Sequence, residues 1–449
     1  MANLIAQSNV TALIGMGMTG QSAARYLTKA GRPFVWLDTR EAPPAFDRVR
    51  EEFPDARFEL GELNVETLLA AAEIIVSPGV SVATPAIAQA QTAGVPVLGD
   101  IELFLREVNA PVVAITGSNA KSTVTTLVGE MAQTAGKKVL IGGNIGVPVL
   151  DLLQQPAAEL YVLELSSFQL ETVSKLAADV STVLNISEDH MDRYDSLAHY
   201  YMAKQRVYFG ARKVVVNRED PLTRPPLAEG VQQFSFGLNV PDRQGFGVIT
   251  KGGQEYLAFE FNTLMPVADI KMPGRHNIAN ALAALALGHA VDLPMAAMLT
   301  TLTQFAGLPH RCQWVAESHG VNYYNDSKGT NVGATLAALQ GLKKDSGKIV
   351  LIAGGVGKGA DFSPLKEAAP GIRAVVVIGE DGEKIAAQFE AMVPVVSAAS
   401  MSEAVAKAAR QARAGDDVLL SPACASFDMF RGFEDRGEHF VQAVKEVLA

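Results

Sequence analysis

Two kinds of segment, one short and one longer, alternate regularly along this chain and differ in how their hydrophobic and polar residues are arranged. Short runs of apolar, mostly β-branched residues are followed by longer stretches with apolar residues at helical spacing. Strands that alternate with helices are typical of βαβ units, in which helices cover both faces of a parallel sheet. The pattern therefore predicts an α/β protein with mainly parallel sheets. In the first part of the chain the predicted strands are residues 10–14, 34–37, 73–76 and 95–98.

The strand–helix series starts three times, which predicts three domains. The first series ends near Gly99, the second begins with the apolar run 111–113, and the third begins near residues 307–311. A chain of 449 residues also exceeds what one hydrophobic core usually serves. The boundaries that we expect are 1–99, 100–307 and 308–449. Later predicted segments are a β-like region at 231–272, helices at 277–291, 294–305 and 401–414, and strands at 348–353, 374–379, 393–397 and 417–421.

The second series opens with a candidate phosphate-binding loop. Residues 114–123 read Ala-Ile-Thr-Gly-Ser-Asn-Ala-Lys-Ser-Thr and lie between a predicted strand and a predicted helix. Backbone N–H groups and the helix N-terminus would cradle phosphate oxygens, Lys121 would reach the terminal phosphates, and Ser122 would ligate Mg²⁺. The usual G-x-x-x-x-G-K-[ST] pattern would place glycine where this chain has Ile115 and Ala120. The alternative is a polar turn with an exposed lysine.

A second glycine-rich turn follows the first strand of the chain. Gly15, Gly17 and Gly20 match G-x-G-x-x-G, and Asp38 ends the next predicted strand. This pattern is typical of dinucleotide-binding folds, but its glycines guarantee only a tight turn and a close backbone approach to a diphosphate. Any nucleotide diphosphate fits that description. The loop at 77–80 either lines the same crevice or is a simple turn.

Ionisable residues in the second series suggest the chemistry. Glu164 lies in an apolar strand, where an unpaired carboxylate is costly, so a role as a Mg²⁺ ligand is favoured. His190 follows the next strand and either binds a metal or caps a loop. The glycine-rich loop at 142–146 suggests contact with a ligand or a need for positive φ. Lys204 lies in a predicted helix, where a lysine considered by itself is expected to be exposed to solvent.

Three polar loops follow strands of the third series, at 325–331, 354–361 and 421–428. Ligands of open α/β sheets bind at the carboxyl ends of the strands, so these loops are expected to converge.

Composition restricts the class of protein further. There are 38 Lys and Arg residues against 48 Asp and Glu residues, a net charge of −10, which argues against general nucleic-acid binding. Anionic substrates must then be bound by local cations. We expect no signal peptide in residues 1–7 and no membrane span, so we expect a cytoplasmic protein in which Cys312 and Cys424 are reduced thiols.

Taken together, the motifs closely resemble those of the Mur ligases of peptidoglycan synthesis, over essentially the whole chain. The motif at 163–170 is similar to the branch of the family that adds D-glutamate. The resemblance rests on Gly-Ser-Asn-x-Lys-Ser-Thr (117–123), Leu-Glu-Leu-Ser-Ser-Phe-Gln-Leu (163–170), Asp-His-Met-Asp-Arg-Tyr (189–194), Gly-Arg-His-Asn-x-x-Asn-Ala (274–281), Asn-Asp-Ser-Lys-x-Thr-Asn (325–331) and Ser-Pro-Ala-Cys-Ala-Ser-Phe-Asp (421–428). Ala120 departs from the family, which usually has glycine there; at positive φ it would cost on the order of 1 kcal/mol.

The resemblance implies a fold and a reaction. The expected fold is a Rossmann-like N-terminal domain that binds a UDP-sugar, a central P-loop-type ATPase domain and a Rossmann-like C-terminal domain that binds an amino acid. ATP would phosphorylate the carboxylate of UDP-N-acetylmuramoyl-L-alanine, and the amine of D-glutamate would attack the acyl phosphate. The partners are thus small molecules, with no nucleic acid and no membrane, and we expect a monomer.

The resemblance also assigns roles to individual residues. Lys121, Glu164, His190 and Lys204 match the catalytic positions. Two Mg²⁺ ions would be held by Ser122, Glu164, His190 and a carbamate, derived from CO₂, on Lys204. ATP would contact Gly117, Ser118, Asn119, Ala120, Lys121, Ser122, Thr123, His276, Asn277, Asn280, Arg311 and Asp326. The UDP-sugar would contact Thr19, Asp38, Arg40, Ser77 and Asn144. D-Glutamate would contact Lys328, Thr330, Lys358, Ser426, Phe427 and Phe433.

Three other functions stay open at this point. A related ligase would add another amino acid, or glutamate to a folate. A dehydrogenase would use the first glycine motif, but it leaves the second and third series unexplained. A nucleotide-binding regulatory protein would not need the set Lys121, Glu164, His190 and Lys204.

Overall fold

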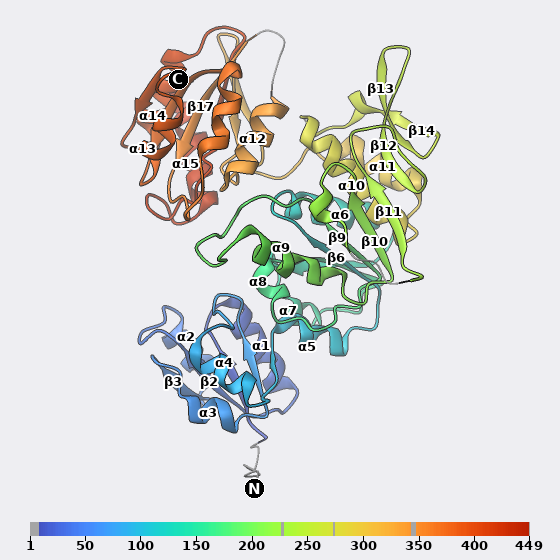
Figure 1. Cartoon of the computed structure of the whole chain (residues 1–449), viewed down its shortest axis with the longest axis vertical. Helices are drawn as coiled ribbons and strands as arrows, with labels where there is room; N and C mark the ends of the chain where they lie inside the picture. Colours follow the sequence, from blue (N-terminus) through green and yellow to red (C-terminus); the bar gives the residue numbers. More distant parts are fainter. Residues whose placement is uncertain (1–8, 226–228, 273, 343–346, 449) are drawn as a thin grey trace.

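The computed structural model describes residues 9–225, 229–272, 274–342 and 347–448. The chain forms three lobes in sequence order, each built around one sheet (Figure 1). The described chain begins in the first lobe and ends in the last. The expectation concerning residues 1–7 lies outside the described residues. Among the residues that the structure describes, no helix combines the length and apolarity needed to cross a bilayer.

The first sheet is entirely parallel, in the order β3-β2-β1-β4-β5. Its inner strands β2, β1 and β4 are mostly buried, as expected where helices cover both faces of a parallel sheet, whereas β3 at one edge is exposed or half-buried. Strand β1 is fully buried, and its neighbours on either side pair with it in register. The elements are β1 (Thr11–Ile14), α1 (Met18–Lys29), β2 (Phe34–Asp38), α2 (Phe46–Glu52), β3 (Arg57–Leu60), α3 (Val65–Ala70), β4 (Glu73–Val76), α4 (Pro85–Thr92), β5 (Val97–Leu98) and α5 (Asp100–Glu107).

The second sheet has the order β14-β13-β12-β11-β10-β9-β6-β8-β7, with β6 between β8 and β9. It is parallel up to β12 and antiparallel from β12 to β14. The strands are β6 (Val112–Thr116), β7 (Val139–Gly143), β8 (Leu160–Glu164), β9 (Val180–Val183), β10 (Lys213–Asn217), β11 (Gln232–Phe236), β12 (Gly245–Lys251), β13 (Gln254–Phe259) and β14 (Asn262–Pro266). The α-helices are α6 (Lys121–Thr134), α7 (Val149–Leu152), α8 (Ser167–Leu170), α9 (Leu197–Gln205), α10 (Arg275–Ala290) and α11 (Met295–Gln304).

The third sheet has the order β15-β16-β20-β17-β18-β19 and is parallel except for the β15–β16 pair. Its elements are β15 (Gln313–Ser318), β16 (Val321–Asn325), α12 (Val332–Gly341), β17 (Ile349–Gly354), β18 (Ile372–Ile378), α13 (Gly382–Phe389), β19 (Val395–Ser397), α14 (Met401–Gln411), β20 (Asp417–Leu420) and α15 (Phe433–Leu448). Short 3₁₀ segments are η1 (Arg206–Tyr208), η2 (Pro221–Thr223), η3 (Val267–Asp269) and η4 (Ser363–Gly371).

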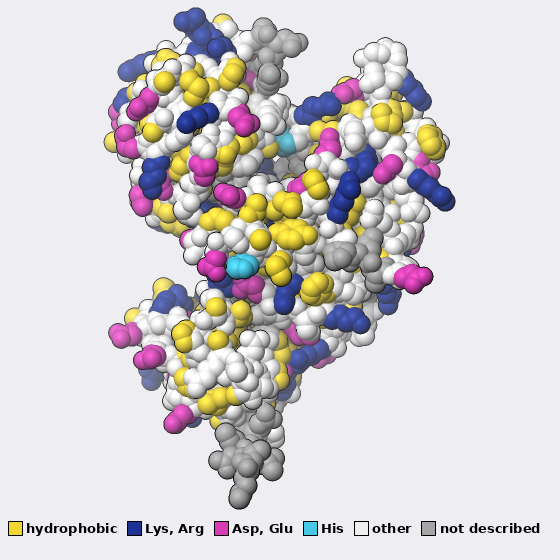
Figure 2. Space-filling model, in the orientation of Figure 1, with side chains coloured by type: hydrophobic (Ala, Val, Ile, Leu, Met, Phe, Trp, Pro, Cys, Tyr) yellow, Lys and Arg dark blue, Asp and Glu magenta, His cyan; other side chains and the backbone are white. Residues whose placement is uncertain are grey.

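The prediction of three mainly parallel α/β units is confirmed. The first two lobes share a hydrophobic core, in which Leu13 and Trp36 belong to the same buried cluster as Phe104 and Tyr161. The buried clusters of the third lobe contain only residues of that lobe. Figure 2 shows a notch on one side of the molecule between the first lobe and the other two.

Candidate active site

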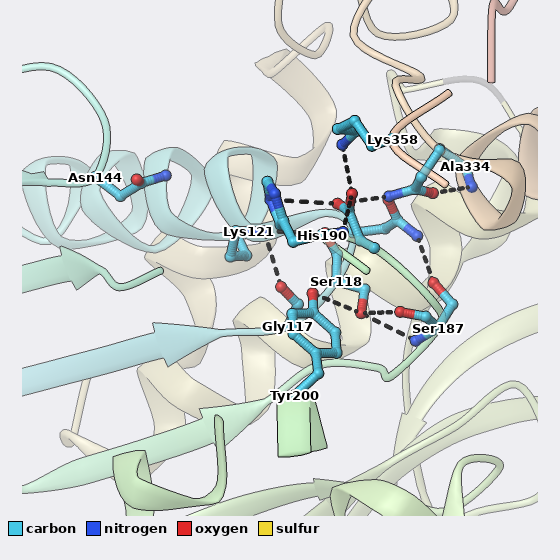
Figure 3. Close-up of polar contacts among 12 residues, drawn as sticks. Gly117, Ser118, Lys121, Asn144, Ser187, His190, Tyr200, Ala334 and Lys358 are labelled. Carbon is cyan, nitrogen blue, oxygen red and sulfur yellow. Dashed lines mark hydrogen bonds and ion pairs between the residues drawn. The ribbon is translucent and has the colours of Figure 1, made fainter. Parts of the chain in front are cut away.

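The loop between β6 and α6 is held in shape by the segment that follows β9. Ser118 N–H donates to Asn185 O (2.9 Å), and Asn119 N–H donates to Asn185 Oδ1 (2.8 Å). Ser118 Oγ donates to Ser187 O and accepts from Ser187 N–H, both at 2.9 Å. Ser118 thus lies between Ser187 and Tyr200 (Figure 3), whose hydroxyl is 3.1 Å from Ser118 Oγ. A loop fixed in this way can present N–H groups at the start of α6 to an anion.

Ala120 ends the loop with φ of 66° and ψ of −4°, in the left-handed region. The sequence expectation that positive φ would make this alanine costly therefore applies, because its Cβ approaches the backbone in that conformation. The geometry of the turn is nevertheless complete, and α6 begins directly at Lys121.

Two cations lie at the start of α6. Lys121 Nζ donates to Gly117 O (2.8 Å) and Ser118 O (2.9 Å) of its own loop, and burial lowers the pKa of this lysine. Arg311 comes from the chain segment that enters the third lobe, and its Nη2 donates to Ser122 Oγ (2.6 Å). Lys121 and Ser122 thus lie where the sequence pattern placed them, with Arg311 added across the lobe boundary.

Glu164 ends β8 and is 2% exposed. Its Oε1 accepts from Asn144 Nδ2 (2.6 Å), whereas its Oε2 is buried and has no hydrogen-bond partner among the described residues. A buried carboxylate oxygen without a partner suits a cation. No group of three or more His, Cys, Asp or Glu side chains in the described part of the chain could hold a metal. This donor set fits Mg²⁺, which usually takes one or two carboxylates together with substrate phosphates, rather than a metal held by protein alone.

His190 and its neighbour Asp189 lie on the loop after β9. His190 has φ of 58°, in the left-handed region that is uncommon for residues other than glycine. Burial lowers the pKa of His190 to about 4, although Asp189 opposes the effect, so the imidazole is neutral at pH 7. A neutral imidazole can ligate a metal or accept a proton.

Asp189 joins this loop to the third lobe. Its Oδ1 accepts from Lys358 Nζ (2.5 Å), and its Oδ2 accepts from Asn331 Nδ2 (3.1 Å). Burial would raise the pKa of Asp189, but Lys358, His190 and Asn331 outweigh it and lower the pKa to about 2. Asn331 also donates to Asn119 Oδ1 (3.1 Å) of the phosphate loop.

Lys204 is 1% exposed, which contradicts the expectation of a solvated lysine from its helical pattern. Its Nζ donates to Gly117 O (2.9 Å) and Thr116 Oγ1 (3.4 Å) and lies 4.6 Å from the centre of the Tyr200 ring. Burial lowers the pKa of Lys204 well below its ordinary value, and the positive charge of Lys121 adds to the effect. The side chain therefore favours a neutral amine.

A cavity of about 340 Å³ brings most of these groups together at the boundary of the second and third lobes. Lys121, His190 and Lys358, which are labelled in Figure 3, are among the residues that line it. Its lining includes Ser118, Asn119, Ala120, Lys121, Ser122, Asn144, Glu164, Phe168, Asp189, His190, Tyr200, Lys204, Arg311, Lys328, Thr330, Asn331, Lys358, Ser426, Phe427 and Phe433. A larger cavity of about 480 Å³ lies at the amino ends of β17, β18 and β20, away from the loops at their carboxyl ends, and none of the predicted site residues lines it.

An adjoining cavity of about 190 Å³ is lined by the other residues expected to hold ATP except Gly117, which lines neither cavity. It is lined by Asn119, Ala120, Thr123, His276, Asn277, Asn280, Arg311, Asp326 and others. Asp326 Oδ1 accepts from Cys312 N–H (3.1 Å) and Oδ2 accepts from Ser421 Oγ (2.7 Å), while burial raises the pKa of Asp326 to about 7. Cys312 and Cys424 are buried, free thiols.

The residues expected at the amine-binding end line the larger of these two cavities. Lys328 Nζ lies 3.8 Å from the centre of the Phe433 ring, and burial lowers the pKa of Lys328 to about 8. Phe427 is 75% exposed and Ser426 is buried. Two aromatic residues and two lysines of the third lobe therefore line the same cavity as Glu164 and His190.

Most residues expected at the UDP-sugar lie apart from the cavity, at the carboxyl ends of β1, β2 and β4. The Asp38 carboxylate accepts from Met16 N–H (2.9 Å) and from Arg40 N–H, Nε and Nη2 (3.0, 2.8 and 2.7 Å). Burial would raise the pKa of Asp38, but these hydrogen bonds lower it. Asp38 thus organises the glycine loop and orients Arg40, which is half exposed. Of the five residues in this set, Asn144 alone lines the cavity, through its contact with Glu164.

Sequence reasoning did not single out Asp189, Tyr200 or Asn331. Asp189 and Asn331 stand in the polar stretches noted at 189–194 and 325–331, but nothing in the spacing predicts that they meet. Tyr200 lies one helical turn before Lys204, which is the only sequence signal that it had.

Three family profiles match the chain: Mur ligase MurD-like N-terminal domain over residues 9–99, Mur ligase middle domain over 115–288, and Mur ligase glutamate ligase domain over 310–424. Proteins named UDP-N-acetylmuramoylalanine--D-glutamate ligase are similar over their whole length. That of Pseudomonas aeruginosa is 58% identical over 447 residues, covering 99% of this chain and 100% of the relative. That of Saccharophagus degradans is 53% identical over 456 residues, covering 100% of both.

Solved structures share the fold at low identity. A pseudomurein peptide ligase type C from Methanothermus fervidus is 18% identical with a TM-score of 0.62, covering 98% of this chain and 100% of that one. A UDP-N-acetylmuramate-alanine ligase from Thermotoga maritima is 18% identical with a TM-score of 0.59, covering 98% and 99%.

Proposed function

The chain belongs to the Mur ligase family, and we propose that it joins D-glutamate to UDP-N-acetylmuramoyl-L-alanine, converting ATP to ADP and phosphate. The family consists of ATP-dependent ligases that form amide bonds in peptidoglycan synthesis. The choice of D-glutamate is carried by full-length identity of 58% to a ligase of that name. We propose domains at 1–99 for the UDP-sugar, 100–307 for ATP and 308–449 for D-glutamate.

The phosphate loop suits the first step, in which the γ-phosphate passes to the substrate carboxylate. Two anions must meet there, so cations and N–H groups have to neutralise them. Lys121 would leave the loop carbonyls that it contacts and bind the β- and γ-phosphates instead. The backbone N–H groups at the start of α6 would hold the phosphate oxygens, since those of Ser118 and Asn119 already donate to Asn185. Ser122 and Glu164 would hold one Mg²⁺, which supplies charge neutralisation for the phosphates. The remaining ATP contacts are His276, Asn277, Asn280, Arg311 and Asp326, around the adjoining cavity.

Lys204 and His190 would complete the metal sites. A carbamate forms when a neutral amine attacks CO₂, and burial beside Lys121 favours the neutral amine of Lys204. The product replaces a cation with an anionic group that offers two oxygens, the type of ligand that Mg²⁺ prefers. His190, neutral at pH 7, would ligate the second Mg²⁺.

The two organic substrates would approach from opposite lobes. Thr19, Asp38, Arg40 and Ser77 would hold the uridine diphosphate, with Asn144 beside the reacting end. D-Glutamate would be bound by Lys328, Thr330, Lys358, Ser426, Phe427 and Phe433. Its amine attacks the acyl phosphate carbonyl, a proton leaves the nitrogen, and phosphate departs with the C–O bonding pair. Closing these groups around the acyl phosphate excludes water, which would otherwise hydrolyse it.

We further propose that the protein acts as a cytoplasmic monomer on these small molecules. The test is phosphate release from ATP and UDP-N-acetylmuramoyl-L-alanine, with and without D-glutamate. Release that requires D-glutamate and yields a new amide is expected. Release with L-lysine, meso-diaminopimelate or L-glutamate instead would assign a sibling ligase or a folate-type ligase, and reduction of a nicotinamide cofactor would assign a dehydrogenase.

A further inference from the structure

The loop at residues 77–80 connects the UDP-sugar site with the rest of the molecule. Ser77 Oγ donates to Gly15 O (3.5 Å), and a Cβ atom added at Gly15 would come within 2.8 Å of Ser77 Cβ. The loop is closed by a turn in which Val80 N–H donates to Ser77 O (2.9 Å). The glycine loop and the 77–80 loop therefore pack directly on each other.

Arg193 reaches this loop from the central domain. Its Nη1 donates to Pro78 O (3.3 Å), and its Nη2 donates to Glu171 Oε2 (2.7 Å). The other oxygen of Glu171 accepts from the Tyr194 hydroxyl (2.6 Å). The side chains of Arg193 and Glu171 are each 16% exposed, so this ion pair is far better shielded from solvent than an ordinary surface pair.

The Arg193 guanidinium also contacts a ring that lines the cavity described above. Its central carbon is 4.5 Å from the centre of the Phe168 ring. The Phe168 ring is in turn 4.8 Å from the imidazole of His190, edge to face. Phe168 lines the cavity that contains Glu164 and Lys204. One arginine is thus shared between the loop at 77–80 and the ring that supports His190.

We propose that Arg193 is a positioning residue that couples occupancy of the UDP-sugar site to the placement of His190. The inference rests on the proposed function, which puts the uridine diphosphate against Ser77 and the reacting carboxylate near His190. A ligand that fixes the 77–80 loop fixes Pro78 O, which holds the guanidinium over Phe168 and so restricts the imidazole. By thermodynamic linkage, if the UDP-sugar strengthens the binding of ATP, then ATP strengthens the binding of the UDP-sugar by the same factor.

The first experiment needs no ligand. We compare amide hydrogen exchange of Val80 in wild type, Arg193→Ala, Arg193→Lys and a matched control, Arg212→Ala. Arg212 is exposed, pairs with Asp179 and lies outside the site. Exchange at Val80 should become about fivefold faster or more in Arg193→Ala, because loss of the Pro78 contact loosens the turn. Unchanged exchange in Arg193→Ala would overturn the proposal.

The second experiment measures coupling in the full-length protein. The Kd of a non-hydrolysable ATP analogue with Mg²⁺ is determined with and without saturating UDP-N-acetylmuramoyl-L-alanine. Wild type and Arg212→Ala should show tightening of about fivefold or more, a typical size for linked sites. In Arg193→Ala the ratio should fall to near one while the Kd of the analogue alone stays the same. Arg193→Lys keeps the charge opposite Glu171 and should restore thermal stability but not the coupling.

The outcomes separate the two proposals. Arg193→Ala that retains the wild-type ratio, or that changes only the melting temperature, would overturn the coupling and leave the proposed function intact. Wild-type protein that fails to bind the UDP-substrate would overturn the proposed function and the coupling with it.

Discussion

Two lysines share one backbone oxygen in the phosphate loop. Lys121 Nζ and Lys204 Nζ donate to Gly117 O at 2.8 and 2.9 Å, and the side chain of Lys204 is buried while that of Lys121 is partly buried. Two ammonium groups at this separation repel each other strongly in a medium of low dielectric constant. In the proposed mechanism Lys121 binds phosphate as a cation, so Lys204 is the lysine whose positive charge the mechanism does not need. A carbamate on Lys204 would replace the repulsion with attraction.

Lys204→Ala should therefore abolish turnover, with a rate at least about 100-fold below wild type, as when one electrostatic group of an active site is lost. High bicarbonate should not restore it, because alanine has no amine to react. Phosphate release is the measurement, and Lys138→Ala, at an exposed lysine, is the control. Near-normal rates in Lys204→Ala would remove the carbamate from the mechanism.

The backbone at Ala120 gives a second prediction at this scale. Ala120→Gly relieves a steric cost of about 1 kcal/mol at positive φ but adds entropy to the unfolded chain, worth about 0.4–1 kcal/mol. The two effects nearly cancel, so the free energy of unfolding should change by less than about 0.5 kcal/mol. Ala120→Val adds a β-branched side chain at the same φ and should be clearly destabilising.

Denaturant unfolding and the KM for ATP test both variants. The reverse order, with valine tolerated and glycine harmful, would show that the loop does not keep this conformation in solution.

At the scale of elements, the start of α5 is tied to the helix that follows Glu164. Asp100 begins α5 and is 2% exposed, with Oδ1 lacking a partner among the described residues. Burial raises its pKa to about 6, although hydrogen bonds from Gln169 of α8 and from backbone N–H groups of α5 oppose the effect. Gln169 also accepts from Ser166 N–H (3.1 Å), which completes a capping box on α8.

Because the pKa of Asp100 is higher in the folded protein than in the unfolded chain, the folded state holds its proton more tightly. Below about pH 4 the carboxyl is protonated in both states and does not change the free energy of unfolding. As the pH rises from there through about 6, the free energy of unfolding falls by something on the order of 3 kcal/mol. Asp100→Asn cannot ionise and should lack this fall. Chemical denaturation between pH 4 and 8 measures the difference between the two curves.

Asp55→Asn, at an exposed aspartate, is the matched control and should follow the wild-type curve. Parallel curves for wild type and Asp100→Asn would contradict the assignment of this pH dependence to Asp100.

The sequence predicted the positions of helices and strands better than it predicted which distant residues come into contact. Apolar periodicity located strands such as β4 and helices such as α10 to within a few residues, because burial acts on each segment separately. It did not predict β3, whose four residues are exposed or half-buried and carry little apolar signal. Nor did it predict the burial of Lys204, since a residue that lies against a loop 87 positions away leaves no mark on its own helix.

The candidate site divides in the same way. Phosphate-loop residues are consecutive, so their roles follow from spacing and helix geometry. The contacts of Asp189 with Asn331 and Lys358 join segments on different domains, and only the folded chain brings them together. The family resemblance supplied the roles of Lys204 and of the amine-binding residues, which composition and periodicity alone did not.

At the scale of the whole molecule, the two domain boundaries are built differently. The first and second domains share one hydrophobic cluster and a bidentate pair between Arg25 of α1 and Asp151 of α7. The third domain has separate cores and meets the phosphate loop and its neighbours through polar contacts of Arg311, Asn331 and Lys358. Polar contacts of this kind can be replaced by contacts with substrates, whereas separating a shared hydrophobic core would expose apolar surface to water. Domain motion should therefore occur at the second boundary.

Removal of the Lys358 side chain tests whether the domains move at the second boundary. Without substrates, Lys358→Ala should shift the protein toward a more open arrangement, because Asp189 then loses its ion pair across the boundary. Small-angle scattering should show a larger radius of gyration than for wild type or for Lys366→Ala, an exposed lysine on the same domain. An ATP analogue together with the UDP-substrate should compact the variant, since Arg311 and Asn331 still bridge the boundary. If Lys358→Ala scatters as wild type does in both states, the ion pair does not hold the domains together, and the other contacts across the boundary, among them those of Arg311 and Asn331, are sufficient to do so.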